Sequence, residues 1–328
     1  DYTKEALLRR VDDMSQLAGV RASRLQHGPE DGTQVLDFWT GSGLRFTVVP
    51  SRGMDISWAE YQGKALCPRA TCRETHPSFF EPGLQGWRRG FFEGMLTTCG
   101  PVFYTEPPKP YELRSIKHGR AAYAPARNVC YDEVWQEDDY QLWASGRMRE
   151  DALVWERRIR TSLGATSFRI VDRVENHGVK PVNHRFQYHI NGGFPVVDEG
   201  SEFVGTSLGT YNRKGEAISS EYHRMQPPSF DAQTAAHDEL MVADDQGYAL
   251  AALINPNCGE GGSLGYYVRY RIDTLPYFFL WKCLTPDRYI VGTEPTSHVP
   301  VDSFDPQDQG REGLEPLMPG EERVYDIE

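Results

Sequence analysis

The hydrophobic positions near the N-terminus follow a helical period. Leu7, Leu8, Val11, Met14 and Leu17 recur at the spacing of one helix face, with charged residues between them. This spacing predicts one helix over residues 1–20. Beyond it the helical period disappears, and short runs rich in β-branched and aromatic residues replace it.

The segments that follow have the pattern of short strands divided by turn residues. Residues 34–40 and 44–49 are rich in β-forming residues and flank Gly41-Ser42-Gly43, which predicts a hairpin. Many short strands with regular turn punctuation are typical of a β-sandwich or barrel, and the lack of helix–strand alternation argues against a parallel sheet. Further strands are predicted at residues 134–136, 140–144, 153–161, 167–174, 185–190, 248–254, 266–272, 277–282, 289–293 and 323–327.

No internal repeat, low-complexity tract or linker interrupts this pattern. We therefore expect one domain over residues 1–328, with an N-terminal helix at 1–20 and an all-β, antiparallel β-sandwich at 35–328. Residues 74–100 are rich in Gly, Pro and aromatic side chains and are predicted to form a loop. Long loops inside compact domains are often functional.

Composition and charge exclude several classes of protein. The net charge of -12 disfavours nucleic-acid binding, because an acidic surface repels phosphates. The chain contains no apolar run of ~18 residues to span a bilayer, and its charged first ten residues show no signal peptide. The six cysteines lack the CxxC spacing of a metal or redox site. They are expected to be free thiols in a reducing compartment, which favours a cytoplasmic location.

Two loop segments in the first half carry candidate binding residues. Arg52 follows a predicted strand, and its guanidinium could bind sugar hydroxyls or a carboxylate. The alternative is a turn with a structural Arg–Asp pair. His118 precedes Gly119 and Arg120 at a loop exit, where both side chains could project into a cleft. A surface histidine, or one satisfied within the core, is the alternative.

A third candidate cluster lies at the end of the strand predicted over residues 185–190. Because side chains alternate along a strand, Gln187, His189 and Asn191 share one face, and Tyr188 points to the other until the strand breaks. A histidine between two amides suits a polar surface that binds sugars. His189 is therefore a candidate catalytic residue, with Tyr188 and Asn191 as candidate substrate contacts.

The fourth cluster lies near the C-terminus. Trp281 and Lys282 are adjacent, and Glu294 follows an apolar strand and directly precedes Pro295. A carboxylate at a strand end near a cleft is a candidate general base. The alternatives are an exposed strand-end glutamate and a lysine that extends its ammonium group to solvent.

Other catalytic templates are absent. The chain contains no GxSxG elbow, Walker loop, GxGxxG after a strand or HExxH. A metal site made by His118, His189 and Glu294 is an alternative, but no pair of ligands at short spacing supports it, so we expect no metal and no cofactor. If these three side chains converge, they supply an acid, a polarising imidazole and a base, the groups needed to open a cyclic hemiacetal.

Several of these segments, taken in order, resemble the galactose mutarotase-like superfamily, in particular the branch labelled aldose 1-epimerase family. The likeness spans roughly residues 35–328. It rests on residues 52–56, Cys99-Gly100, His118-Gly119-Arg120, residues 172–178, residues 188–195, Glu294-Pro295 and residues 317–321.

The resemblance implies a supersandwich fold and an isomerase that interconverts sugar anomers. His189 matches the general acid, His118 the histidine near the ring oxygen, and Glu294 the general base. Arg52 and Lys282 are expected to be substrate contacts specific to this branch. Independently of the resemblance, the ring of Trp281 is suited to stack on the apolar face of a sugar. The order Tyr188-His189-Ile190-Asn191 departs from the pattern of the family. This departure leaves the substrate and the reaction open.

Three functions remain open at this point. The first is an aldose 1-epimerase acting on a small-molecule carbohydrate. The second is a lyase, isomerase or hydrolase on an oxidised or acidic sugar, which Arg52, Arg120 and Lys282 together would suit. The third is a noncatalytic sugar-binding protein. The sequence leaves a homodimer open and names neither the sugar nor its anomer.

Overall fold

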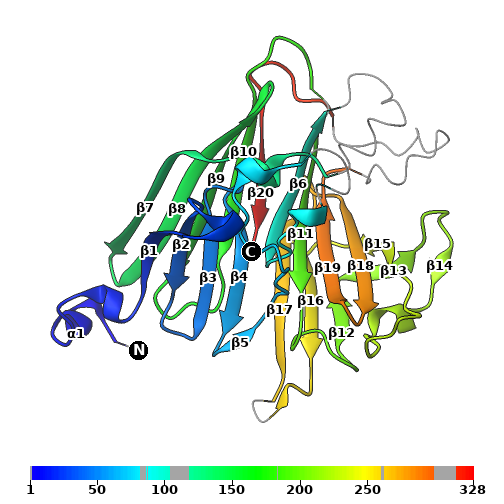
Figure 1. Cartoon of the computed structure of the whole chain (residues 1–328), viewed down its shortest axis with the longest axis horizontal. Coiled ribbons are helices and arrows are strands. Elements are labelled where there is room, and N and C mark those ends of the chain that lie inside the picture. The colour runs from blue at the N-terminus through cyan, green and yellow to red at the C-terminus, as the bar shows by residue number, and fades with distance from the viewer. Residues whose placement is uncertain are drawn as a thin grey trace.

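Two antiparallel sheets contain nearly all the regular structure of the chain (Figure 1). The structure is a computed structural model that describes residues 2–81, 86, 88–103, 118–182, 184–259, 262–298 and 315–328. The larger sheet has twelve strands in the order β1-β2-β3-β4-β6-β11-β19-β18-β15-β13-β14, with β5 paired to β4. The smaller has eight, in the order β12-β16-β17-β20-β10-β9-β8-β7. The predicted all-β, antiparallel sandwich is confirmed.

The strands of the larger sheet vary from two to nine residues in length. They are β1 Gly19–Arg24, β2 Gln34–Trp39, β3 Leu44–Val49, β4 Asp55–Tyr61, β5 Lys64–Ala65, β6 Leu96–Phe103, β11 His184–Gly192, β13 Ser207–Tyr211, β14 Ala217–Ile218, β15 Ala235–Met241, β18 Tyr277–Thr285 and β19 Arg288–Thr296.

The smaller sheet includes the longest hairpin, and the described helices are short. The strands are β7 Arg127–Gln136, β8 Asp139–Glu150, β9 Leu153–Ser162, β10 Arg169–Asn176, β12 Glu202–Gly205, β16 Tyr248–Asn255, β17 Leu264–Arg271 and β20 Glu322–Ile327. The helices are α1 Lys4–Leu8 and the 3-10 turns η1 Met14–Gln16, η2 Gly28–Glu30, η3 Pro77–Phe79, η4 Ala121–Tyr123 and η5 Ser220–His223. None of the helices in these described ranges is long and apolar enough to cross a membrane.

The N-terminal helix is shorter than predicted. It ends at Leu8, and β1 begins at Gly19, so the expectation of one helix over residues 1–20 is wrong. The Asp13 carboxylate accepts a hydrogen bond from the Ser15 N–H at 2.8 Å and starts the separate turn η1. Leu7, Val11 and Met14 are nonetheless buried in the core. Their spacing therefore reflects core contacts made without a continuous helix.

The hydrophobic core lies between the two sheets. We call the side of the larger sheet that packs on the smaller one its inner face, and the opposite side its outer face. One small cavity between the sheets shows which side chains point inward. It is lined by Ile56 of β4, Leu96 of β6 and Ile190 of β11, and by Ile170 and Val268 of the smaller sheet. Because strand side chains alternate, the residues between these inner positions point to the outer face.

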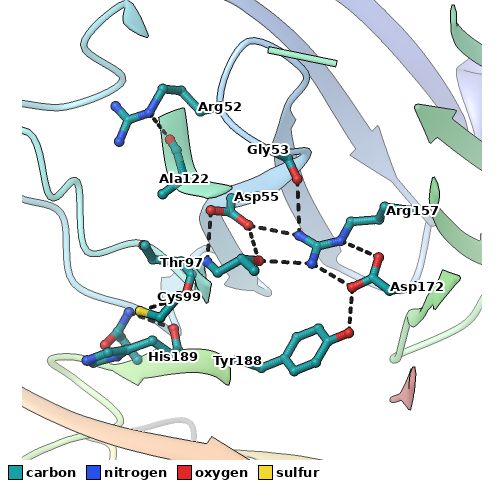
Figure 2. Close-up of polar contacts among 12 residues, drawn as sticks. Arg52, Gly53, Asp55, Thr97, Cys99, Ala122, Arg157, Asp172, Tyr188 and His189 are labelled. Atoms are coloured by element: carbon teal, nitrogen blue, oxygen red, sulfur yellow. Dashed lines mark hydrogen bonds and ion pairs between the residues drawn. The ribbon is translucent and has the colours of Figure 1, made fainter. Parts of the chain in front are cut away.

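A fully buried ion-pair network connects the two sheets within this core (Figure 2). Arg157 of β9 donates to Asp55 of β4 at 2.8 Å and to both carboxylate oxygens of Asp172 on β10 at 2.7 and 2.8 Å. The Thr98 hydroxyl of β6 donates to Asp55 and accepts from Arg157. Since buried charges are stable only when paired and hydrogen-bonded, these strands are held in one arrangement.

Candidate functional site

The centre of the larger sheet brings the predicted acid and base together. Strand β11 is buried along its length and lies between β6 and β19. On its outer face, His189 Nε2 lies 3.2 Å from Glu294 Oε1 of β19, and both side chains are nearly buried. The Gln187 amide, two residues before His189, donates to the other oxygen of Glu294. Glu294 is thus held between two neighbours on one strand.

This His–Glu contact depends on a glycine. Ile190 pairs with Thr293 and Asn191 with Gly292, so Gly292 lies next to the contact on the outer face. A Cβ at this position would overlap Glu294 Oε1 and lie 3.2 Å from His189 Cε1. A side chain at this position would therefore have to displace the Glu294 carboxylate.

We expect Gly292→Ala to lower activity strongly while the chain still folds. The added methyl group would push the Glu294 carboxylate away from the imidazole, but it adds no buried charge or cavity. If the pair acts as the sequence predicts, the rate of sugar-anomer exchange measures the loss, and thermal unfolding followed by circular dichroism checks the fold. A variant with the normal rate would show that the pair does not need this close approach.

Aromatic rings surround His189. The ring of Trp281 from β18 lies with its centroid 5.5 Å from that of His189, and the Phe91 centroid lies 5.4 Å away. Trp281 pairs with Gly292 across the strands, which places it on the outer face beside the His–Glu contact. Trp281, half-buried, presents an apolar surface next to two titratable groups.

His118 also joins this group, with its ring centroid 6.4 Å from that of His189. The backbone brings it there through two facing glycines. The Gly100 N–H donates to the His118 carbonyl at 2.9 Å, and a Cβ on Gly119 would lie 2.8 Å from the Gly100 Cα. Gly119 also has a φ of 64°, in the left-handed region that favours glycine.

Arg288 and Glu93 lie beside this group, and the sequence analysis missed them. The Arg288 guanidinium lies 5.4 Å from the Phe91 ring centroid and 5.6 Å from that of Trp281, and its Nε lies 3.1 Å from Glu93 Oε1. Burial raises the pKa of Glu93, and the nearby Arg288 charge partly opposes this effect. Alternation from Glu294 places Arg288 on the outer face, which is the signal that could have identified it.

The side chain of Asn191 binds a neighbouring loop, and its role as a substrate contact stays a prediction. Its side chain is fully buried, and its amide donates to the carbonyls of Glu93 and Gly94 at 3.0 Å and of His189 at 3.2 Å. It fastens the segment that carries Phe91 and Glu93 to β11. These contacts position the loop beside His189.

Tyr188 and Arg52 are both fully buried. Tyr188 points into the core, where its hydroxyl donates to Asp172, away from His189 (Figure 2). Arg52 is completely buried, and its guanidinium donates to the carbonyls of Ala122, Thr75 and Gly90. Its Cζ also lies 4.1 Å from the centroid of the Tyr123 ring. Arg52 holds loops together and has no donor exposed for a sugar.

Lys282 lies on the opposite side of β18 from Trp281, because adjacent strand residues face opposite ways. Its Nζ donates to the carbonyls of Tyr222 at 2.8 Å and Arg224 at 3.0 Å, and it lies 4.5 Å from the Tyr222 ring centroid. Lys282 is therefore not part of the group around His189, and its role as a substrate contact stays a prediction. With Arg52 and Lys282 buried elsewhere, the cationic set that favoured an acidic sugar is not assembled.

The buried Lys282 ammonium should make stability depend on alkaline pH. Burial lowers the pKa of Lys282 from 10.5 to about 8. Between these values the unfolded chain binds the proton more strongly, so the contribution of Lys282 to the free energy of unfolding rises with pH. We expect the stability difference between wild type and Lys282→Met to move in favour of wild type over this interval. Urea unfolding at several pH values measures it, and a constant difference would contradict the assignment.

Arg120 is exposed and lies with its Cζ 5.1 Å from the centroid of Phe80. It lines a cavity of about 780 Å³ together with residues at the ends of β7, β8 and β9. Arg120 therefore faces a different part of the molecule from the His189–Glu294 contact. Its role as a substrate contact stays a prediction.

No group of three or more His, Cys, Asp or Glu side chains within the described ranges has the arrangement of a metal site. All six cysteines are free thiols. Burial raises the pKa of Cys67 to about 12 and that of Cys72 to about 11, which keeps both in the thiol form at neutral pH.

Comparison with known families adds to this geometry. Residues 30–328 match the model of the family described as Domain of unknown function (DUF4432). The chain belongs to this family. No curated protein matches it. The family description assigns no activity, so the function has to be argued from the site.

Solved structures show that the chain has the galactose mutarotase-like fold. A protein from Klebsiella pneumoniae subsp. pneumoniae MGH 78578, provisionally named aldose 1-epimerase, superposes with a TM-score of 0.80 at 24% identity, over 96% of this chain and 85% of that one. A galactose mutarotase-like protein from Clostridium acetobutylicum gives 0.58 at 9% identity, over 95% and 98%. Galactose 1-epimerase from Lactobacillus acidophilus NCFM gives 0.56 at 9%, over 94% and 97%.

Proposed function

We propose that the protein is an aldose 1-epimerase-like isomerase that interconverts the anomers of a small carbohydrate. The observation that carries this proposal is the 3.2 Å contact between His189 Nε2 and Glu294 Oε1 on the outer face of the central strands. The fold shared with proteins named as mutarotases and aldose 1-epimerases supports it.

The proposed reaction begins with two proton transfers. Glu294, ionised, takes the proton of the anomeric hydroxyl, and His189, protonated, gives a proton to the ring oxygen. The C1–O5 bond then breaks, and an open-chain aldehyde forms. Both oxygens are bonded to C1, so an acid and a base that touch each other can serve both from one side of the sugar.

Ring closure reverses these steps after rotation about the C1–C2 bond. His189 takes the proton of the O5 hydroxyl as O5 attacks C1, and Glu294 returns its proton to O1. The pair therefore ends in its starting protonation state, and no outside acid, base or oxidant is consumed. The amide of Gln187, bound to Glu294, holds the carboxylate in place throughout.

The surrounding side chains have supporting roles in this proposal. Trp281 and Phe91 offer apolar ring faces on which the C–H face of a sugar can stack. His118, 6.4 Å from His189 between ring centroids, is placed to hydrogen-bond a hydroxyl near the ring oxygen. Arg288 is already paired with Glu93, so its charge does not call for an acidic substrate.

Polarimetry on a panel of aldoses, deoxy sugars and uronates tests the proposal. We expect the purified protein to accelerate mutarotation of at least one of them in the presence of EDTA. If a sugar binds but its anomers exchange only at the uncatalysed rate, the protein is a noncatalytic sugar-binding protein and not an epimerase. Turnover that appears only with a divalent metal would favour a lyase, isomerase or hydrolase.

A further inference from the structure

A second cavity, of about 560 Å³, lies on strands β1–β4 of the larger sheet. Strand register explains which side chains line it. Trp39 pairs with Arg45, which pairs with Glu60, and this row crosses β2, β3 and β4. The next row on the same face contains Arg21, Asp37, Thr47 and Trp58. The two tryptophans therefore lie diagonally across β3, with charged and hydroxyl side chains between them.

Both indole N–H groups are engaged within the protein. Trp39 Nε1 donates to the Ser15 carbonyl at 3.0 Å, and Trp58 Nε1 donates to Glu60 at 3.1 Å. The Trp39 ring also rests on Gly19, where a Cβ would lie 2.7 Å from its Cζ2 atom. The two rings are thus fixed and half-buried, and what they offer to the cavity is apolar ring surface.

The polar lining indicates the chemistry of the ligand. Arg21 and Arg45 contribute two positive charges, and Asp37 and Glu60 two negative ones, so the cavity has no net charge to select an ion. Asp37 accepts a hydrogen bond from Thr47 at 2.7 Å. Fixed aromatic faces combined with balanced donors and acceptors match a molecule that has apolar C–H faces and many hydroxyls. The volume lies within the range of small-molecule sites.

We propose that this cavity is a second binding site, for a neutral saccharide. It is separate from the His189–Glu294 site, which β11, β18 and β19 provide. Both lie on the outer face of the larger sheet, since Thr47 and Trp58 alternate with inner-face Val48 and Ile56 around a bulge. The second site does not depend on the proposed epimerase activity.

Titration with neutral hexasaccharides tests this site on the intact protein. The probes are maltohexaose, cellohexaose, xylohexaose and chitohexaose, and the measurements are calorimetry and the ¹H–¹⁵N signals of the tryptophan indoles. We expect at least one probe to saturate and to shift the Trp39 and Trp58 signals. Trp39→Ala and Trp58→Ala should each weaken its binding about tenfold or more, as loss of an aromatic contact predicts.

Two further variants test whether a loss of binding comes from misfolding and whether it is specific to this cavity. Arg45→Ala removes an exposed lining side chain without touching the core and should weaken binding severalfold. Trp143 is a half-buried tryptophan of β8, and the Cζ atom of Arg158 lies 4.7 Å from its ring centroid. Because it lies outside the cavity, Trp143→Ala should leave binding unchanged. The site is refuted if no probe binds, or if binding survives the Trp39 and Trp58 substitutions and is lost in Trp281→Ala.

Discussion

Replacing Glu294 by Gln is expected to reduce anomer exchange by at least ~10²-fold and to leave sugar binding nearly intact. The amide preserves the shape of the side chain but cannot accept the anomeric proton, and one positioned acid–base group contributes ~10²–10⁴-fold. His189→Asn should have a loss of similar size, because it removes the proton donor to the ring oxygen. Saturation-transfer NMR gives the rate, and calorimetry gives the dissociation constant.

Glu93→Gln is the matched control for this prediction. Glu93 lies in the same group of side chains but binds Arg288, not His189. The same chemical change should therefore have a small effect on the rate. If Glu93→Gln and Glu294→Gln reduce exchange equally, or if Glu294→Gln is fully active, Glu294 is not the base.

The second large effect is expected in the core. Arg157→Leu removes the cation of the buried network and leaves the carboxylates of Asp55 and Asp172 without their common partner. Desolvation already raises the pKa of Asp55, an effect that the Arg157 charge opposes. Breaking a buried ion pair from one side costs about 3–5 kcal/mol, so we expect a loss of this size in the free energy of unfolding, or failure to fold.

Two further variants show whether the loss of stability comes from the buried charges. Arg173→Ala breaks an exposed pair with Glu322 and should cost at most about 1 kcal/mol. Arg157→Met combined with Asp55→Asn and Asp172→Asn removes all three charges together and should recover much of the lost stability. Urea unfolding measures all of them. Equal costs for Arg157→Leu and Arg173→Ala would contradict the role of the network.

The buried network also explains how the fold supports the site. Tyr188, which binds Asp172, directly precedes His189 on β11 and pairs with Thr98 on β6. The network therefore fixes the inner face of β11, the strand whose outer face carries His189 of the proposed catalytic pair (Figure 2). Some of the residues that carried the family resemblance are buried and structural. They include Arg52, Asp55 and Asp172.

The strand pattern of the sequence was sufficient to predict the fold class. Turn residues and β-rich runs located strands such as β2, β3, β9 and β11 within a few residues of their bounds. Strand β1 begins within the last two residues of the helix predicted over 1–20, and its remaining residues were assigned to no element. Strand β6 overlaps a segment whose glycines and prolines favoured a loop. Their strand state depends on pairing with β2 and β11, which a local pattern does not contain.

The strand residues of the site were predictable where alternation along one strand was enough. His189 and Gln187 follow from β11 alone, and Trp281 and Glu294 each lie where their strand places them on the outer face. The same rule shows that Trp281 and Lys282, or Tyr188 and His189, face opposite ways. The contact of Glu93 with Arg288 could not be predicted, because it depends on how a loop and a hairpin meet.

The most direct test of the account is exchange between the α and β anomeric proton signals of the sugar that binds most tightly, measured by saturation-transfer NMR with EDTA present. We expect acceleration by wild-type protein and loss of that acceleration in Glu294→Gln at equal occupancy. Tight binding without any acceleration by the wild type would contradict it.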